Sequence, residues 1–333
     1  MVLAKDSLSV KAMGGTELMK YGLEQRLPSD LLDNFQIFAS RVEEELDETK
    51  IRILWLHDLP GDPASEHLKN GGWEKFHRLV FVSNWQMQAY IQAYNIPWSK
   101  CMVLQNAIVP IDEHEKPTDI SVGPTDKIRL AYWSTPHRGL NILVPVFQKL
   151  CEKYDNIELD VYSSFKLYGW EEQDKQFQPL FDACEADPKI NYHGTVSNEE
   201  LRERLKETHI FAYPSTWPET SCICLMEAMS AGLLCVHPNF AALYETSANW
   251  TNMYQWNEDP NKHASHFYAA LDASIESIFN EGVQSRLMSQ KSYANVFYNW
   301  QLRSFQWEQF LISLLDEPRA LPKAGGSFFE YKP

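Results

Sequence analysis

The chain has 333 residues, enough for two hydrophobic cores, and its 44% hydrophobic and 23% charged residues are typical of a folded globular protein. Its formal net charge of −15 repels nucleic acid and anionic lipid on average, so nucleic-acid binding is not expected. The start of the sequence lacks the apolar stretch of a secretory signal, and no segment approaches the roughly 20 apolar residues that span a bilayer. We therefore expect a cytoplasmic protein without a transmembrane segment, for which peripheral membrane contact stays open.

The first part of the chain alternates apolar runs with segments of helical spacing. Residues 16–27 predict a helix, and a second helix is expected directly after residue 83. The charged run 43–48 is either a solvated helix face or a turn. Continuous apolar strands separated by helices indicate a parallel α/β sheet. The strands are predicted at 35–40, 51–58, 79–83 and 101–108.

The segment 110–126 holds three prolines, a glycine and many charges, which is typical of a linker. After it the alternation restarts, and two doubly wound domains facing each other across a cleft are expected. Ligands of such sheets bind beyond the carboxyl ends of the strands. The strands are predicted at 127–134, 157–164, 189–194, 208–215 and 233–238, and the helices at 139–154, 174–186, 197–207, 221–231, 261–280 and 283–315.

The six cysteines include no C-x-x-C pair and no zinc-type spacing with histidines, so we expect reduced and mostly buried thiols. Cys222 and Cys224 would point about 200° apart on a helix, a poor arrangement for a chelate.

Adjacent glycines, Gly14 and Gly15, precede the helix that is expected to begin near Thr16. Glycines let the backbone approach a ligand closely, and a helix N-terminus offers free N–H groups to an anion. The alternative is a simple turn into a helix. The segment matches neither the dinucleotide fingerprint nor the Walker loop, so a nicotinamide or P-loop enzyme loses support.

Two polar residues follow predicted strands. Arg138 stands where a strand gives way to a helix, and a guanidinium there can bind phosphate bidentately; the alternative is a surface arginine. His57 directly follows an apolar strand, where it is either a structural histidine or a polar member of a site.

The segment 215–232, STWPETSCICLMEAMSAG, places Glu219 just before a helix and Glu227 inside it. At about 1.5 Å per residue, Glu227 is on the order of 10 Å from the helix start near Ser221. This separation is too long for one shared metal and argues against an acid–base pair. It suits two hydroxyl-binding carboxylates at the ends of a nucleotide sugar, with its diphosphate at the helix amides between them.

The pattern PS-x3-E-x7-E-A-M-x2-G resembles the E-x7-E signature of retaining, family 4-like (group 1) glycosyltransferases of the GT-B fold. Further segments match in order: MGGTE, the HD at 57–58, FVSNWQMQAYIQAYNIPWSKCMVLQNAI and NYHGTVSNEELRERL. The resemblance covers about residues 12–310. It implies two Rossmann-like domains, an acceptor-side domain over 1–115 and a nucleotide-sugar domain over 125–298, with a C-terminal helix and tail, 299–333, crossing back to the first domain.

The resemblance also implies residue roles. Glu219 would bind hydroxyls of the donor sugar, Glu227 those of the ribose, and Arg138 the diphosphate. Gly15 would approach the distal phosphate, and His57 would line the sugar pocket. The other donor-binding positions that it implies are Gly14, Thr16, Ser163, Gly194, Val196, Thr220 and Ser221.

The implied activity is hexosyl or pentosyl transfer from a UDP- or GDP-sugar to a hydroxyl of a glycan, lipid or small molecule. The resemblance implies retention by front-face attack, in which the donor phosphate helps to take the acceptor proton, with no obligatory metal or other cofactor. Neither the base, sugar and acceptor nor the oligomeric state is fixed by the sequence.

Three departures from the family pattern keep alternatives open. No second basic residue occurs in 130–137, and Arg129 stands too early in its strand, so Arg138 would carry most of the phosphate charge. The N-terminal half is short, and Ala107 replaces the usual glycine. A sugar-nucleotide-binding GT-B module without transferase activity, or a GT-B epimerase or phosphorylase, therefore remains an alternative.

Overall fold

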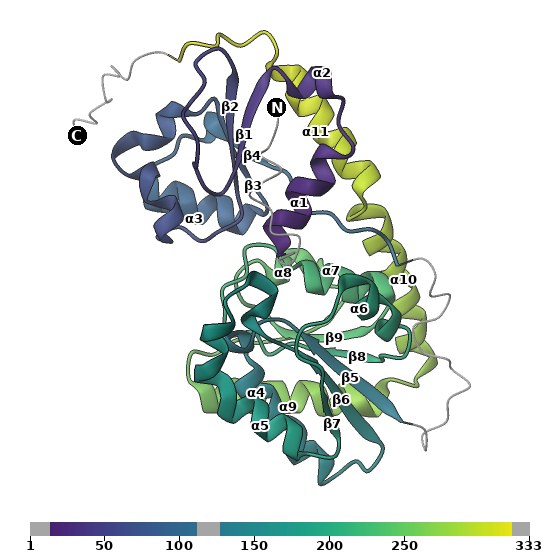
Figure 1. The fold of residues 1–333 in the computed structure, drawn as a ribbon. Helices are drawn as coiled ribbons and strands as arrows, with labels where there is room; N and C mark the ends of the chain where they lie inside the picture. The colour runs from purple at the N-terminus through teal and green to yellow at the C-terminus, as the bar shows by residue number, and fades with distance from the viewer. Residues whose placement is uncertain (1–13, 112–126, 322–333) are drawn as a thin grey trace, which may run out of the picture. The chain divides into compact units, whose positions relative to one another are not determined.

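A computed structural model describes residues 14–111 and 127–321, which form two compact units (Figure 1). Of the described residues, the first unit contains Lys20–Gln105 and those from Ser304 to 321. The second contains 14–19, 106–111 and 127–303. Each unit has one parallel sheet, which confirms the predicted α/β class. Most of the predicted linker, residues 112–126, lies outside the described residues.

The first unit is built on a four-stranded sheet in the order β1-β2-β3-β4, with every pairing parallel. Its central strands, β2 and β3, are mainly apolar because both of their faces are covered; all residues of β2 are buried, Arg52 included. The bounds are α1 Gly15–Glu24, α2 Ser29–Leu32, β1 Phe35–Ala39, β2 Ile51–Leu56, η1 Pro63–Lys75, β3 Arg78–Phe81, α3 Asn84–Tyr94, η2 Trp98–Lys100 and β4 Cys101–Val103.

The charged run 43–48 is not helical, which decides between the two alternatives for it. The buried side chain of Gln36 holds this loop against β1. Its amide donates to the Glu45 carbonyl and accepts from the Asp47 backbone N–H, both at 2.8 Å.

The second unit is built on a six-stranded parallel sheet in the order β10-β9-β8-β5-β6-β7. β5 pairs with β6 on one side and with β8 on the other, so the direction of winding reverses between β5 and β8. Helices α4, α5 and α9 cover one face, and α6, α7 and α10 cover the other (Figure 1). The bounds are β5 Ile128–Trp133, η3 Pro136–Arg138, α4 Leu140–Cys151, β6 Ile157–Tyr162, η4 Phe165–Tyr168, η5 Glu171–Phe177, α5 Gln178–Ala186, β7 Ile190–Tyr192, α6 Asn198–Leu205, β8 Ile210–Ala212, α7 Ile223–Ala231, β9 Leu234–Pro238, α8 Leu243–Ser247, β10 Asn252–Tyr254, α9 Pro260–Ser277 and α10 Glu281–Phe297.

The single long helix predicted over 283–315 is wrong: the structure has α10 and then α11, Trp300–Leu314. The Tyr298 carbonyl accepts from the Ile108 backbone N–H at 2.7 Å, which diverts it from helical bonding. Asn299 then begins a new helix, because its side-chain oxygen accepts from the Leu302 N–H at 2.7 Å.

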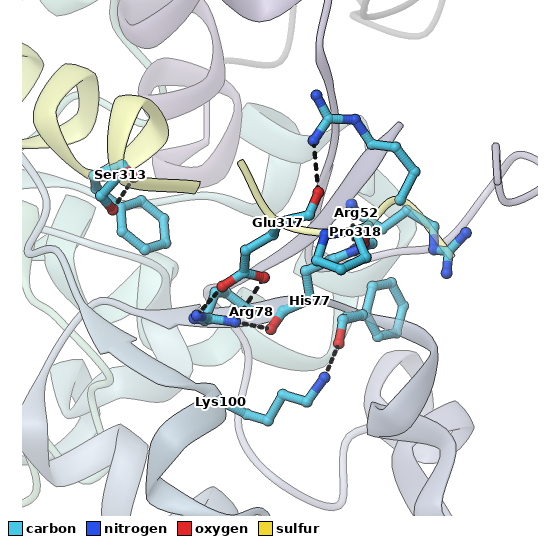
Figure 2. A network of polar contacts seen from close by, with 10 residues as sticks. Arg52, His77, Arg78, Lys100, Ser313, Glu317 and Pro318 are labelled. Carbon is cyan, nitrogen blue, oxygen red and sulfur yellow. Dashed lines mark hydrogen bonds and ion pairs between the residues drawn. The ribbon is translucent and has the colours of Figure 1, made fainter. Parts of the chain in front are cut away.

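The residues that follow α11 are fastened to the first sheet (Figure 2). The Arg78 guanidinium pairs with the Glu317 carboxylate, and His77 Nε2 lies 3.0 Å from the Pro318 carbonyl oxygen. The backbone N–H of Arg52 donates to His77 Nδ1 at 2.9 Å, so Nε2 carries the proton and donates to Pro318. The end of the helix and the residues after it are therefore part of the first unit.

Across the described residues, no helix is both long enough and apolar enough to cross a membrane.

Candidate functional site

The reversal of strand order in the second sheet places two loops side by side. In doubly wound sheets the ligand crevice lies where the order reverses, outside the carboxyl ends of the strands. β5 and β8 are the two strands at this point, and the loops that follow them carry Arg138 and Glu219. The topology therefore brings together two residues that are 81 positions apart.

Gly139 allows the two loops to touch. Its φ of 112° is one that side-chain-bearing residues rarely adopt, and a Cβ atom there would lie 2.1 Å from the Pro214 carbonyl oxygen. Helix α4 begins directly after it. Both the backbone conformation and the close contact with Pro214 therefore require glycine at position 139. The close approach of the two loops places Arg138 next to the loop that follows β8.

Arg138 and Glu219 form an ion pair. Nη1 of the guanidinium donates to Oε1 at 2.8 Å and to Oε2 at 3.0 Å. The hydroxyl of Tyr213 donates to the same Oε1 at 2.5 Å, and Glu219 is only 5% exposed. Desolvation alone would lower the pKa of Arg138, but the Glu219 carboxylate outweighs it and the pKa lies above its ordinary value. The Glu219 carboxylate is therefore held from two sides, by a charged guanidinium and by a phenol hydroxyl.

One edge of the Arg138 guanidinium is left over. Its Nε atom is buried and has no hydrogen-bond partner among the described residues. A buried donor without an acceptor costs about 1–3 kcal/mol, so such groups in native proteins usually have a ligand or water partner. An anion bound at this edge would satisfy it while Nη1 stays on Glu219.

Other buried polar groups around the same strand ends share this property. The hydroxyls of Thr135, Ser163 and Ser221 lack a partner within the described part of the chain. Thr135 and Ser163 are 4% and 2% exposed and follow the neighbouring strands β5 and β6. A cluster of unsatisfied hydroxyls at the carboxyl edge of a sheet indicates polar ligand atoms that the protein alone does not supply.

Helix α7 begins at Ile223, whereas the sequence predicted a start near Ser221. Cys222 is extended, with φ −89° and ψ 96°, so the helix can begin only after it; the loop before it is held by the Glu219 carbonyl, which accepts from the Ala242 N–H at 3.0 Å. Thr220 and Ser221 are therefore loop residues. The N-cap, Cys222, provides no side-chain hydrogen bond to the first turn.

The glycine pair lies beside the start of this helix. A Cβ atom on Gly15 would stand 3.1 Å from Cδ1 of Ile223, and one on Gly14 would stand 2.5 Å from the ring of Tyr168. Both glycines cluster with the second unit. Helix α1 begins at Gly15, so Thr16 lies in its first turn.

Glu227 lies inside α7 in surroundings unlike those of Glu219. Burial raises its pKa to about 7, while the positive charge of Arg202 and the indole of Trp133 partly oppose the rise. Arg202 donates to the carbonyls of Val109 and Pro110, both at 3.0 Å. Near neutral pH, Glu227 is thus divided between its protonated and ionised forms.

The remaining predicted positions are more scattered. Gly194 and Val196 follow β7, the edge strand, and Gly194 has a φ of 62°. His57 belongs to the first unit, where its ring packs on Trp55 at a centroid distance of 4.6 Å. Desolvation lowers the pKa of His57 to about 3, so its imidazole is neutral at pH 7.

Arg129 lies near the start of β5, as the sequence predicted. Its guanidinium pairs with Glu207 and Glu158, and its backbone N–H donates to His209 Nδ1 at 3.0 Å. It is thereby engaged near the start of β5, at the opposite end of the strand from Arg138.

Two contributors to the site were not predicted from the sequence, Tyr213 and Gly139. A tyrosine at the end of an apolar strand is usually a core residue. The contact between its hydroxyl and Glu219 depends on the course of the loop from Tyr213 to Glu219, which the sequence does not show. The Arg-Gly pair is visible in the sequence, but the close approach to Pro214 arises only in the folded sheet. No group of side chains suited to hold a metal ion occurs in residues 14–111 and 127–321.

Part of the chain matches a known protein family. Residues 133–272 match the family described as glycosyl transferases group 1. A search of curated protein sequences gives no match. The matched stretch contains Arg138, Glu219 and Glu227, whereas Gly14, Gly15 and His57 lie outside it.

Solved structures of several glycosyltransferases have the same fold. A glycosyltransferase from Rickettsia africae has a TM-score of 0.61 at 13% identity, with 93% of this chain and 84% of that chain covered. The Anabaena protein HepE, in complex with UDP-glucose, has a TM-score of 0.61 at 16% identity, covering 80% and 73%. A sucrose-phosphate synthase from Thermosynechococcus elongatus has a TM-score of 0.57 at 14% identity, covering 80% and 68%.

The chain shares the GT-B fold with these solved glycosyltransferases, as the sequence motifs predicted. Within it, residues 133–272 match the group 1 glycosyl transferase family.

Proposed function

We propose that the protein transfers a sugar from a nucleoside diphosphate sugar to a hydroxyl acceptor with retention of configuration. The observation that carries this proposal is the divided guanidinium of Arg138. Nη1 is fixed by the buried Glu219, whereas the buried Nε has no partner among the described residues. One arginine thereby joins a carboxylate that can accept sugar hydroxyls to an edge that can bind a phosphate.

In this proposal the two groups act at adjacent parts of the donor. Glu219 accepts hydrogen bonds from hydroxyls of the transferred sugar. Arg138 and the free amides at the start of α7 stabilise the charge that develops on the leaving diphosphate, and Gly15 lets the backbone approach its distal phosphate. The positive charge that compensates the leaving diphosphate is provided by the protein, so the proposed reaction has no obligatory metal.

The rest of the donor extends along the same edge of the sheet. Glu227 binds the ribose hydroxyls, and the strand-end positions Ser163, Gly194 and Val196 border the base. Thr220 and Ser221 contribute backbone amides near the donor. HepE was solved with UDP-glucose, and we propose a UDP- or GDP-sugar for this chain. His57, a neutral imidazole, lines the sugar side.

The acceptor is attacked from the face of the sugar on which the leaving group departs. The acceptor hydroxyl hands its proton to the departing phosphate oxygen as the new glycosidic bond forms and the bond to the diphosphate breaks. Transfer therefore needs no second carboxylate acting as a nucleophile, which agrees with the engagement of Glu219 by Arg138 and Tyr213.

The test begins with the purified protein and a panel of nucleotide sugars. A bound donor raises the melting temperature by linkage, and the hits are then tested for transfer and for donor hydrolysis. Arg138→Ala and Glu219→Ala should each abolish most transfer. Arg129→Ala is the matched control, since it removes an arginine from the other end of the same strand and should leave transfer intact.

The outcomes separate the alternatives. Full transfer activity in both Arg138→Ala and Glu219→Ala would contradict the roles that the proposal assigns to these two residues. Donor binding without transfer or hydrolysis would favour a binding module without transferase activity, and epimerised donor would favour the epimerase.

A further inference from the structure

Tyr213, the first residue after β8, contacts Glu219 through its hydroxyl. The side chain is fully buried, and its O–H donates to Glu219 Oε1 at 2.5 Å. Its ring is stacked on Phe211, with centroids 5.2 Å apart and an interplanar angle of 15°. The hydroxyl of Ser134 lies 3.5 Å from the tyrosine oxygen on another side. Packing thus fixes the ring, and the ring fixes where its hydroxyl points.

In this hydrogen bond the Tyr213 hydroxyl is the donor and Glu219 is the acceptor. Burial, followed by the negative charge of Glu219, raises the pKa of Tyr213 well above its ordinary value of 10. The phenol therefore keeps its proton at any physiological pH and acts as the donor. Glu219 Oε1 consequently accepts from both Tyr213 and Arg138, whereas Oε2 accepts from Arg138 alone, at 3.0 Å.

This asymmetry distinguishes the two oxygens of one carboxylate. A carboxylate held by Arg138 Nη1 alone, which reaches both oxygens, can rotate about its terminal bond, because that torsion is soft. The second donor removes this freedom by engaging one oxygen from a different direction. The remaining acceptor capacity then lies mainly on Oε2.

We propose that Tyr213 is a positioning residue for the transfer reaction: it locks the Glu219 carboxylate in one orientation, in which Oε2 is the oxygen that receives a hydroxyl of the donor sugar. This inference rests on the proposed function, because it assigns Tyr213 a role through Glu219. It makes Tyr213 a determinant of how well the enzyme recognises the sugar, as distinct from the nucleoside diphosphate that carries it.

The first experiment compares two ligands in Tyr213→Phe, which removes the hydroxyl and keeps the ring. A hydrogen bond to a charged group is worth about 10- to 100-fold, so kcat/KM for the nucleotide sugar should fall by about this factor. The affinity for the nucleoside diphosphate without its sugar should stay within about 2-fold. Equal losses for both ligands would overturn the proposal, because they would show a general disturbance of the site.

The second experiment asks whether Tyr213 acts through Glu219. Tyr213→Phe is combined with Glu219→Ala, and the four proteins are compared in a double-mutant cycle. With the carboxylate gone, removal of the hydroxyl should change kcat/KM by less than about 2-fold. An undiminished loss in the Glu219→Ala background would mean that Tyr213 acts only through packing, which overturns the proposal.

Tyr298→Phe is the matched control. Tyr298 is also fully buried, and its hydroxyl donates to the Thr246 carbonyl at 2.7 Å. The variant should show a similar change in melting temperature to Tyr213→Phe but no preferential loss of sugar recognition.

The failures of the two proposals are distinguishable. If the wild-type protein transfers no sugar, the proposed function is wrong. If Glu219→Ala transfers sugar as well as the wild type, the role assigned to Glu219 is wrong, and in both cases the role of Tyr213 falls with it. If Glu219→Ala loses activity while Tyr213→Phe keeps wild-type kcat/KM, only the proposal for Tyr213 is wrong.

Discussion

Glu219 and Glu227 are eight positions apart in one segment, yet their surroundings are opposite. Glu219, in the loop before α7, accepts hydrogen bonds from the guanidinium of Arg138 and the phenol of Tyr213. Glu227, inside the helix, is desolvated, and its pKa rises to about 7. The difference shows that position relative to a helix start decides the chemistry of a carboxylate. A loop can bring charge partners from a neighbouring strand, whereas a helix interior mainly buries the group.

The largest expected effect separates the two carboxylates by ligand. Glu219→Ala should reduce transfer by about 100- to 1,000-fold, as expected when a group that contacts the reacting sugar is lost from a preorganised site. Binding of the sugar-free nucleoside diphosphate should change by no more than about 3-fold. Steady-state kinetics and calorimetric titration measure the two quantities. Equal losses in both would erase the proposed distinction between the sugar end and the nucleotide end.

The next effect concerns the contact that delivers Arg138 to Glu219. Gly139→Ala should destabilise the protein by at least about 1–3 kcal/mol for the strained φ, with a further loss from the contact to the Pro214 carbonyl. Transfer should fall with it, because the two loops must separate.

Gly169→Ala is the matched control for this variant. Gly169 also has a positive φ, 72°, but a Cβ there meets nothing within 4 Å. Thermal unfolding of the two variants isolates the steric term. A Gly139→Ala protein as stable as Gly169→Ala would contradict the contact.

A smaller effect is expected for the other carboxylate. Glu227→Ala should weaken the binding of the nucleotide sugar and of the nucleoside diphosphate alike, by about 10-fold, which corresponds to about 1.4 kcal/mol. The reason is that ribose belongs to both ligands. If only the sugar-bearing ligand were affected, the proposed roles of the two glutamates would have to be exchanged.

The last expected effect is a pH dependence of the stability, which we assign to Glu227. The pKa of Glu227 is raised from 4.5 to about 7 on folding, so between these values the folded protein holds a proton that the unfolded chain lacks. The stability contributed by Glu227 therefore falls as the pH rises from 4.5 to 7, and stays low above it. Glutamine does not titrate, so the melting temperature of Glu227→Gln relative to wild type should rise over this range, by roughly 5–10 °C.

The melting temperatures of the wild type and Glu227→Gln are measured at matched pH values across this range. A flat difference between them would show that burial does not shift the Glu227 carboxyl.

The sequence predicted the parts of the fold that depend on local pattern. Continuous apolar runs identified every strand of both sheets except β10, which has only three residues, Asn252–Tyr254. The pattern failed at 283–315, because helical spacing continues through Tyr298 and Asn299 while a bond from Ile108, distant in sequence, interrupts the backbone. Long-range hydrogen bonds of this kind leave no periodic signal.

The site shows the same division. Arg138 and Glu219 could be placed at strand ends from the sequence, but their pairing depends on the order of strands in the sheet, which puts β8 beside β5. Tyr213 illustrates the limit more sharply, since its burial was predictable and the target of its hydroxyl was not. His57 belongs to the first unit and the other three residues to the second, so its membership of the same site stays a prediction.

The attachment of the C-terminal segment also has a practical consequence for protein engineering. Arg78 and His77, at the start of β3, find partners in Glu317 and Pro318. Shortening the protein to the end of α11 would remove the partners of the Arg78 guanidinium and the His77 imidazole N–H at the edge of the sheet. Truncated versions, and versions with a C-terminal affinity tag, should therefore keep the chain through at least Arg319. The Arg319 guanidinium itself donates to the Leu315 and Glu317 carbonyls.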